Sequence, residues 1–153
     1  MGSQDTSHAA RAVTVRCRNH DEVQVRLCDP FRPDEDRVQY AVEAHAPGLV
    51  VRVDQVVAWD RGADLVPFLE GLASDFRGWD GRREWQTNDG DLAVGAVFRS
   101  GGHVGLTWTL HPWRRAAGGW KASVTTWLEA GEQMSALAAE ARHFFARGDG
   151  DRD

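Results

Sequence analysis

Six histidines, two cysteines and 23 carboxylates are the side chains of this chain that could hold a metal ion or carry acid–base catalysis. A metal site needs at least three such groups close together, and a regular spacing in the sequence commonly reveals them. No such spacing links the six histidines, which are His8, His20, His45, His103, His111 and His143. His103 and His111 fall on one face of a predicted strand, but eight residues of strand separate them by roughly 27 Å. The sequence therefore predicts no metal site and no cofactor.

Three stretches resemble catalytic or ligand-binding motifs but lack the residues that would complete them. Asn88-Asp89-Gly90-Asp91 has neither the alternating acids nor the closing glutamate of a calcium loop, so it predicts a turn. Gly101-Gly102 precedes a predicted strand, whereas a phosphate-binding loop leads into a helix. No serine or cysteine lies in a strand–elbow–helix context. We expect no catalytic residues, and the sequence favours a protein that is not an enzyme.

Seven tryptophans are the unusual feature of the composition. Trp127 falls on the open face of a predicted strand, and Trp113 lies in a loop beside two arginines. Exposed tryptophan with arginine is typical of the residues that dominate protein interfaces. The candidate partner-binding residues are therefore Trp113, Arg114, Arg115, Trp127, His103 and His111. The alternative is that the aromatic side chains of the open face pack on one another or on the N-terminal hairpin.

A second hypothesis places a pocket between the predicted sheet and helices. Trp59, Trp85 and Trp108 would line it, because an apolar, aromatic interior with a few polar groups is typical of small-molecule sites. This hypothesis describes a small-molecule binder or an enzyme.

Residues 91–129 provide the pattern around which the remaining elements can be arranged. Apolar side chains alternate with polar ones in three successive runs, which include Leu92, Val94, Ala96 and Phe98, then Val104, Leu106, Trp108 and Leu110, then Trp120, Ala122, Val124, Thr126 and Leu128. A period of two predicts three antiparallel strands with one buried face. The expected registers set Phe98 near Val104 and Val94 near Trp108.

Two hairpins are predicted before this region. In the first, Cys17 would oppose Val23, and its two cysteines would lie on opposite faces, so we expect no disulfide between Cys17 and Cys28. In the second, Pro47-Gly48 suits a type II turn that sets Glu43 against Arg52. A bulge at Gln55 would restore the alternation beyond it.

The apolar period changes to that of a helix over residues 64–77 and again over 131–147. With a further strand over 83–87, this predicts an α+β fold: a mostly antiparallel sheet of about seven to eight strands with two amphipathic helices packed on one face. We expect a single domain over residues 12–147, with disordered tails at 1–11 and 148–153.

The composition limits the classes of partner. A net charge of −5 argues against a nucleic-acid partner, since phosphate binding needs a concentrated basic surface. No apolar run is long enough for a membrane span, and no signal peptide is visible, so we expect a cytoplasmic protein. The strong preference for arginine over lysine resembles bacterial proteins encoded by high-GC genomes.

Three segments resemble a family of small actinobacterial proteins of unknown function over roughly residues 36–146. They are Arg77-Gly78-Trp79-Asp80-Gly81, Gly102-His103-Val104 and Glu129-Ala130-Gly131-Glu132-Gln133. More distantly, the layout is similar to cytoplasmic immunity proteins that neutralise contact-delivered toxins. The resemblance implies no catalytic residue, because the family has no established activity.

These observations favour a non-enzymatic protein-binding module, with an immunity-like role implied by the second resemblance. Its binding surface would be the open sheet face or the loop over residues 111–119. The partner would be another protein or a second copy of the chain, and a small-molecule ligand remains the alternative.

Overall fold

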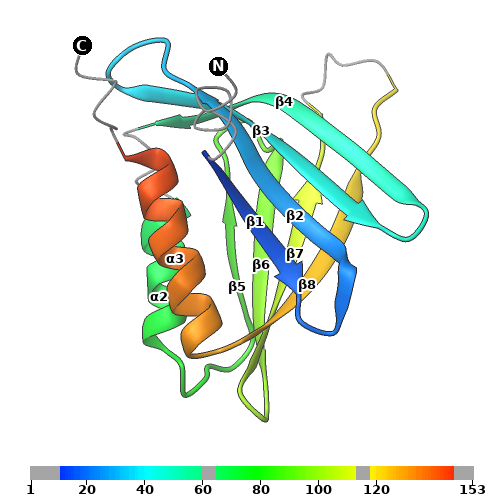
Figure 1. Ribbon diagram of the computed structural model, residues 1–153, viewed down its shortest axis with the longest axis vertical. Coiled ribbons are helices and arrows are strands. Elements are labelled where there is room, and N and C mark those ends of the chain that lie inside the picture. The colour runs from blue at the N-terminus through cyan, green and yellow to red at the C-terminus, as the bar shows by residue number, and fades with distance from the viewer. Residues whose placement is uncertain (1–10, 60–64, 113–117, 147–153) are drawn as a thin grey trace, which may run out of the picture.

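The computed structural model describes residues 11–59, 65–112 and 118–146. The elements in this part are β1 (Ala12–Cys17), β2 (His20–Phe31), β3 (Arg37–Ala46), β4 (Leu49–Trp59), α2 (Leu65–Ser74), β5 (Arg82–Gln86), β6 (Leu92–Arg99), β7 (His103–Leu110), β8 (Ala122–Glu129) and α3 (Glu132–Phe145). The strands pair antiparallel in two four-stranded sheets, with the orders β1-β2-β3-β4 and β5-β6-β7-β8. The α+β fold predicted from the sequence is confirmed. Both helices lie next to each other on the same side of the two sheets (Figure 1).

The strands form two sheets rather than the one sheet expected from the sequence, which corrects the predicted layout. Two helices with axes 8–10 Å apart cover a width of about 20 Å, which corresponds to about four strands at ~4.8 Å spacing. One eight-stranded sheet would therefore leave about half of its apolar face in water. Division into two sheets removes this exposure, because the inner face of each sheet is covered by the other sheet and by the helices.

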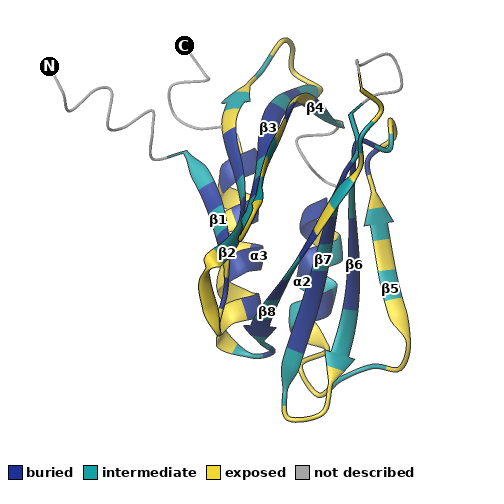
Figure 2. Ribbon diagram, turned by 90° about the vertical axis from the view of Figure 1, so that its right-hand side faces the viewer, coloured by how far each residue is buried: buried dark blue, intermediate teal, exposed yellow. Residues whose placement is uncertain are grey.

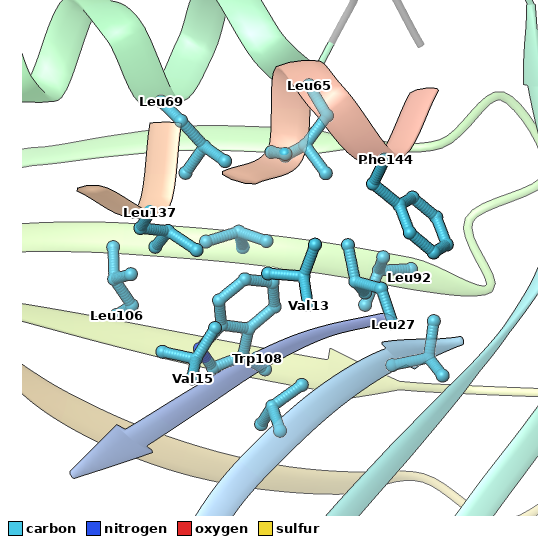
Figure 3. Close-up of a cluster of buried hydrophobic side chains, with 14 of the residues drawn as sticks. Val13, Val15, Leu27, Leu65, Leu69, Leu92, Leu106, Trp108, Leu137 and Phe144 are labelled. Atoms are coloured by element: carbon cyan, nitrogen blue, oxygen red, sulfur yellow. The ribbon is translucent and has the colours of Figure 1, made fainter. Parts of the chain in front are cut away.

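One continuous cluster of buried apolar side chains joins the two sheets and the two helices. Figure 3 shows Val13, Val15 and Leu27 from the first sheet meeting Leu92, Leu106 and Trp108 from the second, with α2 and α3 contributing Leu65, Leu69, Leu137 and Phe144. Fully burying one such side chain contributes about 1.5–3 kcal/mol, so this shared core holds the two sheets together.

The two sheets also meet along a seam between β1 and β8. The backbone N–H of Arg18 donates to the carbonyl oxygen of Trp127 at 2.9 Å. The backbone N–H of Trp127 in turn donates to the thiol sulfur of Cys17 at 3.4 Å. This reciprocal pair ties the end of β1 to the outer edge of β8, so the thiol of Cys17 replaces a backbone acceptor.

Most of the predicted strand pairings are confirmed. Phe98 pairs with Val104 and Val94 with Trp108, as the alternation predicts. Glu43 pairs with Arg52, and Gly48 has the positive φ of 79° that the second central position of a type II turn requires. The register of β3 with β4 shifts between Tyr40 and Val42, and this is the bulge expected near Gln55. Cys17 and Cys28 are both free thiols.

The predicted register of the first hairpin is partly wrong. Val15 pairs with Val25 as expected, but Cys17 pairs with His20 and not with Val23. The register shifts between Arg16 and Cys17, where the chain turns toward β8 to form the seam. The alternation of β1 and β2 contains no information about β8, which explains the error.

Both helices are shorter than the predicted ranges. Asp64, the first residue of the range predicted for the first helix, lies outside the described residues, and Phe76, near the end of that range, follows the end of α2 and is exposed. Among the residues that the structure describes, no helix is long and apolar enough to cross a membrane.

Candidate binding surface

The outer face of the β5–β8 sheet carries a regular grid of side chains. Strand pairing sets residues of this face side by side in rows, with one residue from each of the four strands in three rows and one from each of β6, β7 and β8 in the last. The rows are Gln86–Ala93–Thr109–Ser123, then Glu84–Gly95–Thr107–Thr125, then Arg82–Val97–Gly105–Trp127, and finally Arg99–His103–Glu129. Figure 2 shows β5 at the edge of this sheet, with exposed and half-buried residues alternating along it. We call this grid the outer surface of the second sheet.

The centre of this surface is made of small residues, and two large side chains lie across it. A side-chain carbon added to Gly105 would come 2.6 Å from the ring of Trp127, which shows that the ring lies directly on the glycine. The guanidinium of Arg82 lies over Gly95 in the same way. Glycine at both positions lets an arginine and a tryptophan lie flat against the sheet from its two edges.

Trp127 is held on three sides. The ring rests on Gly105, the backbone is bound to β1 at the seam, and the guanidinium of Arg99 stacks over the ring at 4.2 Å from its centre. A cation over the face of tryptophan is stabilised by the ring quadrupole. The result is a half-buried tryptophan in a fixed position, which is the kind of side chain that anchors protein interfaces.

The remaining surface is polar, and four of its hydroxyl groups are paired with one another. The hydroxyl groups of Thr107 and Thr125 lie 2.9 Å apart, and those of Thr109 and Ser123 lie 2.8 Å apart. Beside them is an open hollow of about 400 Å³ whose lining includes Arg82, Glu84, Gln86, Ala93 and Gly95. The ion pair between Arg82 and Glu84, at 2.9 Å, leaves the wall of this hollow close to neutral.

Glu129 closes one corner of the surface and also caps α3. Its carboxylate accepts hydrogen bonds from the backbone N–H groups of Gly131 and Gln133, while the side chain of Gln133 accepts one from the N–H of Glu129. The backbone bonds from Gly131 and then Gln133 lower the pKa of Glu129, and the positive charge of Arg18 adds to this effect. The carboxylate is therefore a fixed negative charge close to the stacked Arg99.

The structure brings only some of the predicted partner-binding residues together. Trp127 and His103 both belong to the outer surface of the second sheet. They lie in neighbouring rows, near the corner that Glu129 closes. His111 follows the end of β7, and its Nδ1 lies 3.1 Å from the carbonyl oxygen of Trp120, away from that corner. Trp113, Arg114 and Arg115 lie outside the described residues.

Arg99 was missed by the sequence reasoning. The alternation that turns Phe98 inward turns Arg99 outward, and the hairpin register sets it beside His103, next to the strand that carries Trp127. The signal was thus present in the strand pattern, but only the pairing of three strands places the arginine over the tryptophan ring.

The tryptophans of the alternative pocket do not enclose a ligand-sized space. Trp59 and Trp85 line the same cavity with Tyr40, Leu65 and Thr87, but its volume is only about 10 Å³. A cavity of roughly this size holds about one water molecule. Trp108 is fully buried elsewhere in the core, and its Nε1 donates to the hydroxyl of Thr126 at 3.0 Å.

Two buried titratable groups lie near this cavity. The phenol of Tyr40 has no hydrogen-bond partner among the described residues, and burial together with the charge of Asp91 raises its pKa. Burial also raises the pKa of Asp91, although the hydroxyl of Thr87 donates to its carboxylate at 2.6 Å. Within residues 11–59, 65–112 and 118–146, no group of three or more histidines, cysteines or carboxylates could hold a metal ion.

These features define an α+β protein with two antiparallel sheets around one core and a tryptophan–arginine surface on the second sheet. The chain belongs to a family of unknown function, DUF6228, whose pattern matches residues 16–148. No curated protein and no solved structure matches the chain.

Proposed function

We propose that this protein is a non-enzymatic binding module that holds a protein partner on the outer surface of the second sheet. The observation that carries the proposal is the stack of Arg99 on Trp127 on Gly105, which fixes a half-buried tryptophan on an outward face. Rigid aromatic anchors lose little conformational entropy when a partner covers them, and they are enriched at the centres of interfaces.

The surroundings of the stack support this proposal. Small side chains on one side of the stack allow the backbone of a partner to approach closely, and each hydroxyl pair uses only one of its two O–H donors internally, which leaves the other for an acceptor of the partner. The immunity-like role is one case of the proposal, in which the partner is a toxin. A secreted toxin encoded by the neighbouring reading frame would favour that case.

The test compares Trp127→Ala and Arg99→Ala with a matched control in the first sheet. Trp59→Ala removes another exposed tryptophan that an arginine, Arg37, covers at 5.5 Å. Each protein is immobilised, and the proteins it retains from a lysate of its own source are quantified by mass spectrometry. We expect one protein of the lysate to be retained at least tenfold less by Trp127→Ala and Arg99→Ala than by wild type. Trp59→Ala should retain the same protein as wild type does.

Sedimentation of the free proteins shows whether that species is a second copy of the chain. The thermal midpoint of each variant is measured in parallel, and we expect changes of at most about 4 °C, because the tryptophan is only half-buried. Equal retention by all four proteins would contradict the proposal. Unfolding of Trp127→Ala would show instead that the stack serves the fold.

A further inference from the structure

The outer face of the first sheet carries a second hollow, on the opposite side of the shared core from the surface described above. Its volume is about 380 Å³, and Ala41 of β3 forms its floor. Asp29 and Phe31 of β2 border one side, and Arg52, Asp54 and Gln55 of β4 border the other. This hollow plays no part in the proposed function.

Backbone irregularities on both neighbouring strands produce the hollow. The pairing of β2 with β3 shifts between Cys28 and Phe31, and the pairing of β4 with β3 shifts at the level of Ala41. Asp29 and Gln55 are the non-glycine residues with positive φ in the described part of the chain, at 54° and 60°. The two bulges move side chains apart over the small Ala41, so the floor stays open between walls that carry two carboxylates, the guanidinium of Arg52 and polar groups.

The charge of this region is unbalanced toward the negative. The guanidinium of Arg52 binds Asp29 and Asp54 at 2.8 Å each and Glu43 at 2.5 Å. Arg26 adds a second positive charge 3.8 Å from Glu43. The three carboxylates of Asp29, Glu43 and Asp54 thus face two guanidinium groups, and the imidazole of His45 lies 4.0 Å from Glu43. One oxygen of Asp29 and one of Asp54 carry the bonds to Arg52, which leaves the other oxygen of each for a ligand.

An aromatic ring stands beside these carboxylates. The side chain of Phe31 is 61% exposed, which is a large apolar surface to leave in water next to a hollow. A ligand that suits both features has a flat cation and an apolar stem. An arginine side chain meets this description, because its guanidinium binds carboxylate oxygens in a planar fork and stacks on aromatic faces. A lysine ammonium offers neither planarity nor stacking.

We propose that this hollow binds the guanidinium of an arginine side chain presented by a partner protein. The carboxylates of Asp29 and Asp54 accept its N–H groups, and Phe31 covers one face of the group. The site binds one arginine side chain, and this binding does not depend on what occupies the outer surface of the second sheet.

The test is an NMR titration of the backbone amide signals with N-acetyl-L-arginine methylamide, at constant ionic strength. We expect saturable shifts confined to amides around the floor, at Gln39, Ala41 and Gln55, with a dissociation constant of the order of millimolar, about −4 kcal/mol. N-acetyl-L-lysine methylamide should bind at least fivefold more weakly. Sodium chloride alone should produce no shifts in the same pattern.

The variant that tests the mechanism is the pair Asp29→Asn and Asp54→Asn. Asparagine tolerates the positive φ at position 29 and still accepts a hydrogen bond from Arg52, so the bulge is preserved. We expect at least tenfold weaker binding, while the matched control Asp21→Asn, near the other end of β2, leaves binding unchanged. Phe31→Ala, an exposed position outside the core, provides a second test if the double variant does not fold.

Shifts that do not saturate, equal binding of the lysine compound, or unchanged binding by both the double variant and Phe31→Ala would each overturn the proposal. The Trp127→Ala protein should bind the arginine compound as well as wild type does. This last measurement separates the arginine site from the proposed surface on the second sheet, since either can fail without the other.

Discussion

Gly105 determines where the ring of Trp127 lies. Any larger residue would place a carbon 2.6 to 2.9 Å from the ring, which is closer than side-chain carbons approach one another. Because the backbone of Trp127 is fixed at the seam and Arg99 covers the ring, the ring has little freedom to move aside. The glycine is therefore part of the binding surface, although it contributes no side chain to it.

Gly105→Ala should displace the ring of Trp127 and weaken partner capture as strongly as Trp127→Ala does. We expect a loss of about 1–3 kcal/mol in the free energy of unfolding, which is typical of overpacking. Ser123→Ala, on the same face and already exposed, is the matched control and should change little. Urea denaturation and partner capture measure the two effects, and an unchanged capture by Gly105→Ala would contradict this role of the glycine.

Asp91 makes the stability depend on pH. Burial raises its pKa, so the folded protein holds the proton more tightly than the unfolded chain does. The stabilisation that this proton provides is complete below the unfolded pKa of about 3.9 and is lost as the pH rises through the folded value.

As the pH rises from the unfolded pKa of about 3.9 toward neutral, wild type loses this stabilisation and Asp91→Asn does not. Asp91→Asn should therefore become more stable relative to wild type over this pH range. Asparagine keeps an acceptor for the hydroxyl of Thr87 and carries no charge. Chemical denaturation of both proteins at several pH values measures the difference, in which all other titrations cancel. A difference that is independent of pH would show that Asp91 is not perturbed by folding.

At the scale of elements, the three segments that resemble an uncharacterised family have structural roles. Gly78 has a φ of 113°, and a side chain there would meet the ring of Phe98. Trp79 packs on that same ring and donates to the carbonyl oxygen of Ala96. The segment at residues 129–133 caps α3 through the reciprocal hydrogen bonds of Glu129 and Gln133. The segments at residues 77–81 and 129–133 therefore support the fold, while His103 of the third segment and Glu129 also belong to the outer surface of the second sheet.

Glu129→Ala should lower the thermal midpoint, because the first backbone N–H groups of α3 lose their acceptor. Glu129→Gln keeps a neutral acceptor, so its thermal midpoint should lie between those of Glu129→Ala and wild type. The pKa of Glu129 is lowered by folding, so its contribution is present above the unfolded pKa and disappears as the pH falls through the folded value. Equal midpoints of the three proteins at pH 7, measured by circular dichroism, would rule out this cap.

The strands and their registers could be predicted from the sequence, since alternation is a local property and each hairpin fixes its own pairing. The pairs Val94–Trp108 and Glu43–Arg52 follow from such patterns alone. Alternation shows which face of a strand is buried but not what covers it, so the division into two sheets was missed. The stack of Arg99 on Trp127 was missed for a similar reason, because it needs three strands in register. The hollow over Ala41 depends on two backbone bulges, of which only the one at Gln55 left a signal.

At the scale of the whole molecule, two units of four strands and a helix share one core and join at the seam. Beyond the packed side chains, the seam contains the bond from Arg18 to Trp127 and the bond from Trp127 to the thiol of Cys17. The thiol thus has a role that its burial alone does not reveal.

Cys17→Ala should cost about 1–3 kcal/mol of unfolding free energy, because the buried N–H of Trp127 loses its acceptor. Cys28→Ala is the matched control: its thiol is equally buried, but the contact with Arg52 at 3.9 Å is long and Arg52 has three carboxylate partners. We expect the control to cost clearly less in urea denaturation. Equal losses for the two variants would show that the sulfur acceptor adds nothing to burial.

The seam joins residues 110 positions apart, Cys17 and Trp127. During synthesis on a ribosome, β1–β4 can pair as soon as residue 59 has emerged, but the strand that closes the seam arrives much later. Throughout that interval the inner side chains of the first sheet lack α3 and the completed second sheet to cover them. A nascent chain of this protein therefore displays part of an apolar sheet while residues 60–127 are synthesised. A chaperone that shields such sheets should retain ribosome-bound chains stalled before residue 127 and release those stalled well after α3.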